Sequence, residues 1–338
     1  MNSKNIIFVK ENQAELINKE VSLPGKGEIL VRLCVSTISS GTERANLMGS
    51  KTVSWNRPEA KEAIFPRRSG YSSSGIVEQV GEDVTKFKIG DKVALWWSTH
   101  SQYVTISEKR ACLIDDVPFE DAALFHIATF PLAAIRKCRL EIGESAIVMG
   151  MGILGIVAVN LLKAAGAVPV IAVDPDYTKR EKALKCGADF AFDPYDTDFV
   201  KKVKEATNGG ANIGIEVTGI GAGLDGILDC MALKGRVALL GCTRNSDFTI
   251  DYYRKVHGPG ITLIGAHTAA RPDFESSNGW WTQIDDISSL KKLTEMGRIK
   301  LSSIIDETHS PTEATKVYSR LETEKTFPIV QFDWRNLK

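Results

Sequence analysis

The chain has 338 residues, with 42 basic and 42 acidic side chains, and a 43% hydrophobic content that suits a globular protein. The zero net charge gives no argument for a nucleic-acid or anionic-membrane partner, and no apolar run approaches the roughly 18 residues of a membrane span. Because the N-terminus does not have the pattern of a signal peptide and the six cysteines form no C-x-x-C pair, we expect a cytoplasmic protein. The length of the chain predicts two domains.

Short apolar stretches separated by glycine turns fill the first part of the chain. Residues 5–21 are predicted to form a hairpin, and Glu28 to Val35 alternates apolar and polar side chains as a strand does. The S-S-G-T-E segment at 39–43 is predicted as a strand end or loop before a short helix. Further predicted strands lie at 76–81, 88–95 and 100–106. This spacing is typical of a small β-barrel or sandwich.

The same region contains an irregular segment and a histidine that carry separate expectations. Residues 51–68 include Trp55 and two prolines, and one interpretation of this segment is a lid. His100 begins the last of the predicted strands. We interpret it, like His309 near the other end of the chain, as an ordinary surface histidine.

The stretch from Ser145 to Asp174 has the order strand, G-x-G-x-x-G, helix, strand and acid. Gly150 permits the tight turn, Gly152 lets the backbone approach a pyrophosphate, and Gly155 lets the helix lie close to the strand. The helix start also offers N–H groups to phosphates. Asp174 follows Gly150 by 24 positions and is predicted to accept hydrogen bonds from the adenosine ribose, which favours NAD over NADP.

Two basic residues follow this acid. Lys179 and Arg180 lie close enough in sequence to contact the cofactor and to weaken the preference for NAD. The other interpretation is that they form the solvated face of the next helix.

Strands and helices alternate in the second part of the chain. The predicted helices lie at 120–139, 224–233, 290–296 and 314–321. The predicted strands beyond the nucleotide motif lie at 211–217, 235–241, 260–265 and 328–332. This alternation predicts an α/β fold with a doubly wound parallel sheet.

The order of these parts resembles the medium-chain dehydrogenase/reductase superfamily. The resemblance rests on Gly41-Thr42-Glu43, Gly70 to Gly75, Gly90-Asp91-Lys92-Val93, the nucleotide motif and Glu216-Val217-Thr218-Gly219. It implies a GroES-like β-barrel catalytic domain over residues 1–120, a Rossmann NAD-binding domain over 121–268, and a return to the catalytic domain over 269–338. The chain is most similar to sorbitol and threonine dehydrogenases, in a branch that carries S-S-G-T-E instead of the zinc cysteine.

The resemblance also places the positions at which zinc members hold their metal. Ser40 stands where those members have a cysteine, Tyr71 and Ser72 where they have histidine and glutamate, and His126 at the third ligand position. Zinc prefers thiolate, imidazole and carboxylate ligands, and only His126 is of that kind. We therefore expect no metal in this chain.

A proton donor must then replace the metal, because hydride transfer to a carbonyl produces an alkoxide. Thr42 stands where zinc members carry the hydroxyl of their proton relay. We hypothesise that Tyr71 donates to the substrate oxygen and that His126 tunes or relays the proton. The alternative is that Tyr71 only fills the metal cavity and His126 is a hydrogen-bonded core histidine. Glu43 is expected to hold neighbouring N–H groups, with substrate contact as a weaker hypothesis.

The resemblance carries further to the cofactor contacts, whereas the substrate candidates rest on residue type. The cofactor-binding candidates are Gly150, Gly152, Ile153, Leu154, Gly155, Asp174, Arg180, Thr218, Gly219, Gly241, Cys242 and Ala266. Aromatic and hydrogen-bonding side chains that would suit a sugar or cyclitol ring are Arg254, His257, Trp280 and Trp281, with Trp55, Trp96 and Trp97 as further aromatics. For any one of these aromatics, a place in the core or a subunit interface is the alternative.

These observations predict a zinc-independent, NAD-dependent dehydrogenase that interconverts a secondary alcohol and a ketone on a sugar-like or cyclitol-like substrate. One alternative is a reductase of activated C=C bonds or quinones, and another is an NAD-binding regulator without turnover. The resemblance also implies a homodimer or homotetramer, with residues 260–265 as a candidate edge strand.

Overall fold

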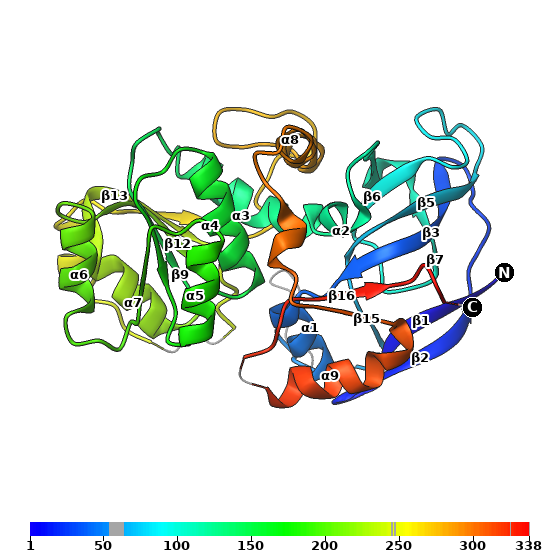
Figure 1. The fold of residues 1–338 in the computed structure, drawn as a ribbon, viewed down its shortest axis with the longest axis horizontal. Coiled ribbons are helices and arrows are strands. Elements are labelled where there is room, and N and C mark those ends of the chain that lie inside the picture. Colours follow the sequence, from blue (N-terminus) through cyan, green and yellow to red (C-terminus); the bar gives the residue numbers. More distant parts are fainter. Residues whose placement is uncertain (54–63, 245, 247, 325, 338) are drawn as a thin grey trace. The chain divides into compact units, whose positions relative to one another are not determined.

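The computed structural model describes residues 1–53, 64–244, 246, 248–324 and 326–337, and the chain divides into two units (Figure 1). The first unit contains residues 1–127 and 291–338, and the second contains residues 128–290. Residues 54–63, the larger part of the segment for which a lid is one interpretation, lie outside the described residues.

The chain returns to the first unit at Lys291 rather than at residue 269. Contacts with α3 (Phe125–Lys137) explain this difference. The Arg136 guanidinium lies 3.6 Å from the centre of the Trp281 ring and donates to Asp286 at 2.9 Å. Gln283 donates to Thr129 at 3.1 Å. The segment before residue 291 is therefore attached to the helix of the second unit.

The first unit is built mainly from antiparallel sheets. One sheet has the order β2 (Gln13–Glu20), β1 (Asn2–Lys10), β4 (Arg67–Arg68). The larger sheet has the order β15 (Glu307–His309), β16 (Val330–Asp333), β3 (Glu28–Thr37), β5 (Ser72–Val80), β6 (Lys92–Trp96), β8 (Ala111–Leu113), and β7 (Tyr103–Ser107) also pairs with β3. The helices of this unit are α1 (Ser40–Leu47), α2 (Phe119–Ala122) and α9 (Ala314–Thr323).

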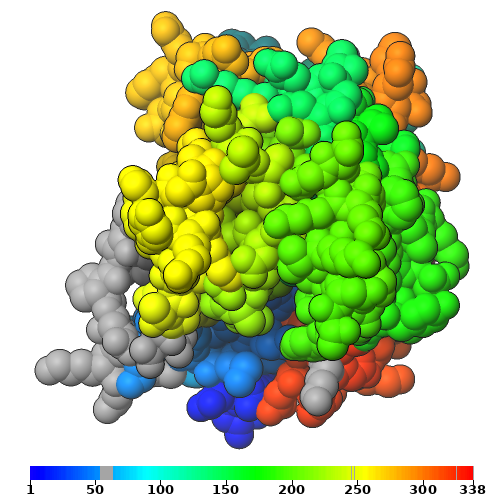
Figure 2. All heavy atoms as spheres, turned by 90° about the vertical axis from the view of Figure 1, so that its left-hand side faces the viewer, coloured from blue at the N-terminus to red at the C-terminus, as the bar shows by residue number. Residues whose placement is uncertain are grey.

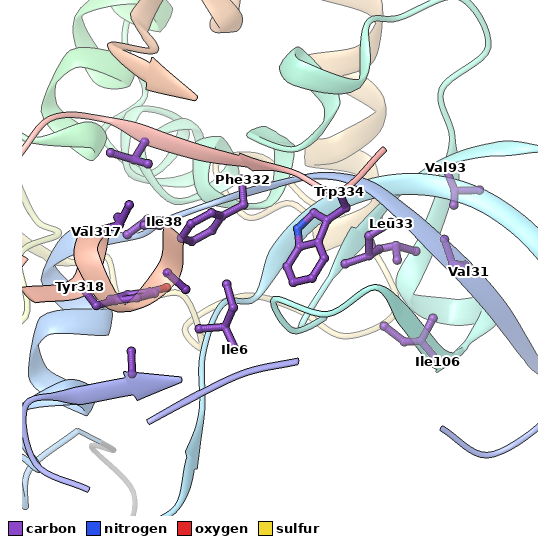
Figure 3. Close-up of a cluster of buried hydrophobic side chains, with 14 of the residues drawn as sticks. Ile6, Val31, Leu33, Ile38, Val93, Ile106, Val317, Tyr318, Phe332 and Trp334 are labelled. Carbon is purple, nitrogen blue, oxygen red and sulfur yellow. The ribbon is translucent and has the colours of Figure 1, made fainter. Parts of the chain in front are cut away.

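The core of the first unit joins segments from both ends of the chain. Val31 and Leu33 of β3 pack in one cluster with Val317 and Tyr318 of α9 and with Phe332 of β16 (Figure 3). These side chains are almost completely buried. Burial of apolar area on this scale explains why the C-terminal segment closes the sheet that the N-terminal segment begins.

The second unit is a parallel sheet. Its order is β11 (Phe190–Phe192), β10 (Val170–Val173), β9 (Ala146–Met149), β12 (Ala211–Glu216), β13 (Met231–Leu239), β14 (Thr262–Gly265). Numbered along the unit, this is 3-2-1-4-5-6, the doubly wound order of dinucleotide-binding sheets. The remaining helices of this unit are α4 (Ile153–Ala164), α5 (Tyr177–Lys185), α6 (Phe199–Ala206) and α7 (Gly221–Asp229), with the π-helical turn η2 (Tyr253–His257), while α8 (Gln283–Glu295) leads back to the first unit.

The structure differs from the predicted elements in a few places. The helix α1 begins at Ser40, so Ser40, Thr42 and Glu43 lie on its first turns rather than on a strand end or loop. The predicted helix over 120–139 is two helices, α2 and α3.

Candidate functional site

The turn between β9 and α4 brings three glycines together. Gly150 has a φ of +99°, which favours glycine. A Cβ atom on Gly155 would lie 1.8 Å from the Gly150 carbonyl oxygen, whereas nothing lies within 4 Å of a Cβ built on Gly152. The helix start at Ile153 and Leu154 has no side-chain cap, so its first N–H groups remain available to an anion.

Asp174 lies directly after β10 and is 6% exposed. Its Oδ2 accepts from the Met151 N–H at 2.8 Å, and its Oδ1 accepts from the Asp176 N–H at 2.9 Å. These bonds hold the carboxylate against the glycine turn. Each oxygen of a carboxylate has a further lone pair, so both can still accept from ribose hydroxyls.

Arg180 does not lie on a solvated helix face. Its Nη1 donates to the Asp174 carbonyl at 2.7 Å, to the Pro175 carbonyl at 2.9 Å and to Asp193 Oδ2 at 3.0 Å. Its side chain is 17% exposed, because these bonds hold it beneath the loop that carries Asp174. Lys179 also points to this loop, with its Nζ 3.9 Å from Asp174 Oδ2.

A buried carboxylate organises the neighbouring strand end, and it was absent from our candidate residues. Glu216 ends β12, and its side chain accepts from the Thr218 N–H at 2.7 Å, from the Gly219 N–H at 3.1 Å and from the Thr218 hydroxyl. Burial raises the pKa of Glu216, against the opposing effect of these hydrogen bonds. Glu216 therefore fixes the turn in which Thr218 and Gly219 lie. In the sequence, the indication of this residue was its place in the E-V-T-G segment on which the resemblance partly rests.

The other predicted cofactor residues at this edge also lie together. Gly219 has a φ of +68°, and a Cβ there would lie 2.7 Å from the Cys242 carbonyl oxygen. A Cβ on Gly241 would lie 2.4 Å from the Gly219 nitrogen. Cys242 is exposed, and Ala266 is buried just after β14. The carboxyl ends of the strands thus form one surface, where doubly wound sheets bind ligands.

In the first unit, three aromatic rings converge. The His126 ring centre lies 5.4 Å from that of Tyr71 and 4.5 Å from that of Trp97, both in edge-on geometry. His126 is 1% exposed, and Trp97 adopts a φ of +57°. A bulky residue in this conformation is an outlier, and such outliers cluster at functional sites. Trp97 was expected only as a general aromatic, because its place beside His126 depends on the fold.

The Tyr71 hydroxyl donates a hydrogen bond to Ser39 Oγ. Ser39 is the N-cap residue of α1, yet its hydroxyl makes no capping bond to the helix. An N-cap serine ordinarily accepts from the second or third N–H of its helix. The contact with Tyr71 therefore takes the place of a cap, and it joins Tyr71 to the residue that directly precedes α1.

His100 is fully buried, so its interpretation as a surface histidine is wrong. Its Nδ1 lies 2.7 Å from Ser36 Oγ, and its Nε2 lies 3.2 Å from Glu43 Oε2. Glu43 is 2% exposed and accepts from the Ser39 N–H at 2.9 Å, as expected for a residue that holds loop N–H groups. The partners of His100 are more than 50 residues away in sequence, and no local pattern indicates them.

The aromatic and basic substrate candidates lie in the second unit. Arg254 is exposed and donates to Asp251 at 2.9 Å, and the His257 ring stacks on Tyr253. The yellow segment that contains them lies on the face shown in Figure 2. The Trp280 ring lies 4.6 Å from Lys137 Nζ, and the Trp281 ring is covered by the Arg136 guanidinium, so cations already occupy one face of each ring.

Comparison with known proteins places this geometry in a family. The family model described as "Alcohol dehydrogenase GroES-like domain" matches residues 25–131, and that described as "Zinc-binding dehydrogenase" matches residues 154–281. The chain belongs to the zinc-type medium-chain dehydrogenase superfamily. It is therefore a dehydrogenase of the medium-chain alcohol type, with a GroES-like domain and a Rossmann sheet.

Individual relatives cover most of this medium-chain dehydrogenase. The L-threonine 3-dehydrogenase of Pyrococcus horikoshii is 26% identical over 86% of this chain and 87% of its own. The D-guloside 3-dehydrogenase of Escherichia coli is 24% identical over 80% of this chain and 82% of its own. The crystal structure of 2R,3R-butanediol dehydrogenase from Bacillus subtilis superimposes with a TM-score of 0.81 at 20% identity, over 98% of this chain and 99% of that one.

The positions that hold zinc in this superfamily have a poor donor set here. Tyr71 donates its hydroxyl to Ser39, and the Ser72 hydroxyl donates to the Ala123 carbonyl at 2.7 Å. Ser40 offers a hydroxyl in place of a thiolate, which leaves His126 as the one ligand that zinc prefers among these positions. Across the residues that the structure describes, no group of three or more His, Cys, Asp or Glu side chains could hold a metal ion. By their side-chain chemistry, the residues that the resemblance places at the ligand positions are a poor match for zinc.

In the part of the chain that the structure describes, each helix is too short or too polar to cross a membrane.

Proposed function

We propose that this chain is a zinc-independent, NAD-dependent dehydrogenase that interconverts a secondary alcohol and a ketone on a sugar-like or cyclitol-like substrate. One observation carries the proposal: Tyr71, at one of the zinc-ligand positions that the resemblance gives, donates to Ser39 and packs against the buried imidazole of His126, which stands at another. Hydroxyl and imidazole groups are the groups that hold and transfer a proton at a carbonyl oxygen.

The preference for NAD follows from Asp174. Its carboxylate is fixed by the N–H groups of Met151 and Asp176, and it faces the same turn that offers N–H groups to a pyrophosphate. A carboxylate in this place accepts from the ribose hydroxyls of NAD and repels the 2′-phosphate of NADP. Lys179 weakens this repulsion, because its ammonium lies 3.9 Å from the carboxylate.

The glycine turn and Asp174 would hold the cofactor, which would supply the hydride when the substrate is reduced. Tyr71 holds the carbonyl oxygen with its phenolic proton and gives that proton to the oxygen as the new C–H bond forms. Ser39, which accepts from Tyr71 in this structure, is placed to return a hydrogen bond to the tyrosinate. His126 lies against the Tyr71 ring, and its imidazole tunes or relays the proton with which Tyr71 is restored from solvent.

The sugar-like substrate is supported by the relatives and by the polarity of the site. The curated D-guloside 3-dehydrogenase acts, by its name, on a sugar derivative. Ser39 is bonded to Tyr71, and Ser40 and Thr42 follow it in the first turn of α1; hydroxyl groups of this kind suit a substrate with several hydroxyls.

Turnover assays test the proposal. The protein is incubated with NAD and, separately, myo-inositol, sorbitol and methyl guloside, and with NADH and an enone or a quinone. Formation of NADH with a polyol, in protein that contains less than about 0.1 zinc per chain, supports the proposal. Oxidation of NADH by the enone or quinone alone would support the reductase instead. Tight NADH binding without any turnover would support a regulator.

We also propose that the protein is a homodimer. The strand β14 ends the parallel sheet, and Thr262 and Leu263 on it are exposed. An exposed sheet edge carries unpaired backbone groups and pairs readily with another edge. Light scattering at several concentrations tests this, and a monomer throughout would contradict it.

A further inference from the structure

His100 supports the chain segment that carries Tyr71. The main-chain N–H of His100 donates to the Ser69 carbonyl at 2.9 Å. Gly70 has a φ of +74°, and a Cβ atom there would lie 2.6 Å from the His100 ring. The backbone that leads into Tyr71 is therefore packed directly on the buried imidazole.

The other side of the same imidazole faces Glu43. Three different donors meet this carboxylate: the Ser39 N–H at 2.9 Å, the Tyr318 hydroxyl and His100 Nε2 at 3.2 Å. Burial, and then Glu43 itself, raise the pKa of Tyr318 well above its ordinary value, so Tyr318 remains a donor. The carboxylate is thus held on three sides inside the core of the first unit.

The donor inventory fixes the direction of the hydrogen bonds. Trp334 can only donate, and its Nε1 donates to Ser36 Oγ at 2.8 Å. Ser36 Oγ also lies 2.7 Å from His100 Nδ1, and His100 Nε2 lies 3.2 Å from Glu43 Oε2, where an ionised carboxylate can only accept. The chain Trp334–Ser36–His100–Glu43 is satisfied throughout, and the labelled side chains of Trp334 and Tyr318 lie in the apolar cluster of Figure 3. Buried networks of this kind are rigid.

Glu43 transfers this rigidity to Ser39. Its Oε1 accepts from the Ser39 N–H at 2.9 Å, and its own N–H donates to the Ser39 carbonyl at 2.9 Å. Both main-chain groups of Ser39 are therefore bonded to one residue. The Ser39 hydroxyl takes part in neither of these bonds, and it accepts a hydrogen bond from the Tyr71 phenolic group.

We propose that Glu43 and His100 are positioning residues that fix the Tyr71 hydroxyl from both ends. His100 holds the backbone at residues 69–70, and Glu43 holds Ser39, which holds the hydroxyl. This inference rests on the proposed function, because it assigns these residues to the reaction through Tyr71. The Tyr71 ring packs against Trp97 and His126, and the bond to Ser39 gives its hydroxyl a fixed acceptor.

The first experiment reads the Tyr71 hydroxyl without a substrate. The full-length protein is labelled with ¹³Cζ-tyrosine, and the Tyr71 resonance is assigned with Tyr71→Phe. We expect Ser39→Ala and Glu43→Gln to move this resonance and Ser39→Thr, which keeps a hydroxyl, to restore it. Ser74→Ala is the matched control, because Ser74 is a buried serine of the same unit that donates to the Phe119 carbonyl at 2.7 Å. An unchanged resonance in folded Ser39→Ala and Glu43→Gln proteins would overturn the inference.

The second experiment is a double-mutant cycle in turnover, with the best polyol among myo-inositol, sorbitol and methyl guloside. Tyr71→Phe is expected to lower kcat roughly 100-fold or more. Ser39→Ala should lower kcat about tenfold, the loss typical of one hydrogen bond, with KM changed less. If Ser39 acts through Tyr71, then Ser39→Ala has no further effect in the Tyr71→Phe protein. Equal losses in both backgrounds would indicate a structural role and contradict the inference.

The two readouts separate the inference from the function on which it rests. If no polyol is oxidised but the Tyr71 resonance responds as described, the proposed function fails and the positioning network stands. If polyols are oxidised and the resonance does not respond, the inference fails and the function stands. Melting curves with NADH confirm that each variant remains folded.

Discussion

A single buried carboxylate links the two halves of the nucleotide motif. Asp174 accepts from the N–H of Met151, within the glycine turn, and from the N–H of Asp176, which starts the next helix. The residue that would face the ribose therefore also fixes the turn that would face the pyrophosphate. Affinity for the adenosine half and order in the phosphate half depend on the same side chain.

Asp174→Asn tests this double role. The amide keeps one acceptor oxygen but loses the charge, so NADH should bind roughly ten- to a hundredfold more weakly, as when a charge-assisted hydrogen bond is lost. NADPH should lose less affinity or gain some, because the repulsion of its 2′-phosphate disappears. Calorimetric titration with both cofactors gives the ratio. Asp176→Asn is the control, since asparagine can still cap α5, and an unchanged ratio in Asp174→Asn would contradict the assignment.

Residues whose partners are close in sequence could be predicted, and those with distant partners could not. The glycine turn and Asp174 lie within one strand–helix–strand unit, so their spacing reports their geometry. His100 finds its partners at Ser36 and Glu43 only when β3 and α1 are packed around it. From the sequence alone, His100 is interpreted as a surface residue, because its neighbours in sequence do not indicate a partner for a buried imidazole.

At the scale of elements, Gly152 and Gly155, the last two glycines of the nucleotide turn, have different roles. Gly155 sets the distance between α4 and the strand, because its Cβ would collide with the Gly150 carbonyl oxygen. Gly152 leaves open space in front of the helix start. Both glycines belong to one motif, yet only Gly155 is needed for the packing of α4 against the strand.

Alanine substitutions should separate these tasks. Gly155→Ala is expected to lower the free energy of unfolding by about 1–3 kcal/mol, because the added methyl overpacks a closed contact. Gly152→Ala should leave stability unchanged, since Gly152 has a φ of −76° and open surroundings, but should weaken NADH binding about tenfold or more. Denaturant unfolding and NADH titration measure both effects. Equal losses of stability in the two variants would refute this division.

The strand β15 and the helix α9 are joined by an ion pair that makes stability depend on pH. Hydrogen bonds from Arg320 lower the pKa of Glu307 from 4.5 to about 2, and His309 donates to the same carboxylate at 2.7 Å. His309 is therefore paired rather than a simple surface histidine. Because the folded pKa lies below the ordinary one, this contribution to stability is present above about pH 4.5 and is lost as the pH falls towards 2.

Glu307→Gln should therefore be less stable than the natural protein at pH 6, with a smaller difference at pH 3. Urea midpoints at the two pH values measure this, and added salt should reduce the difference because the pair is partly exposed. Asp83→Asn is the control, since its pair with Lys26 is exposed and contributes little. If the two proteins differ in stability by the same amount at both pH values, the ionisation of Glu307 does not contribute to the pH dependence.

Element boundaries show where local pattern was insufficient. The predicted helix over 224–233 ends at Asp229, and β13 begins at Met231. Leu233, which fits a continued apolar helix face, is 77% exposed on the strand. Pairing of β13 with β12 and β14, which are distant in sequence, decided this boundary against the local periodicity.

At the scale of the whole molecule, membership of a zinc-type family does not by itself establish the chemistry of the site. Both units have the family's architecture, and the parallel sheet has the expected strand order. The resemblance places Ser40, Tyr71 and His126 of the first unit at the ligand positions, and Tyr71 is bonded to Ser39. A fold can keep its scaffold while the residues that carry the chemistry change, so the metal must be tested separately from the family.

Metal removal gives this test. Dialysis against a chelator is expected to leave kcat with a polyol and the melting temperature unchanged, and added zinc should not raise either, because the site lacks thiolate and carboxylate ligands. The double variant Ser40→Cys with Tyr71→His is the positive control: together with His126 it supplies one thiolate and two imidazoles, and it should gain close to one zinc per chain by mass spectrometry. About one zinc in the natural protein, with turnover lost on its removal, would show that His126 has other partners and that Tyr71 does not replace the metal.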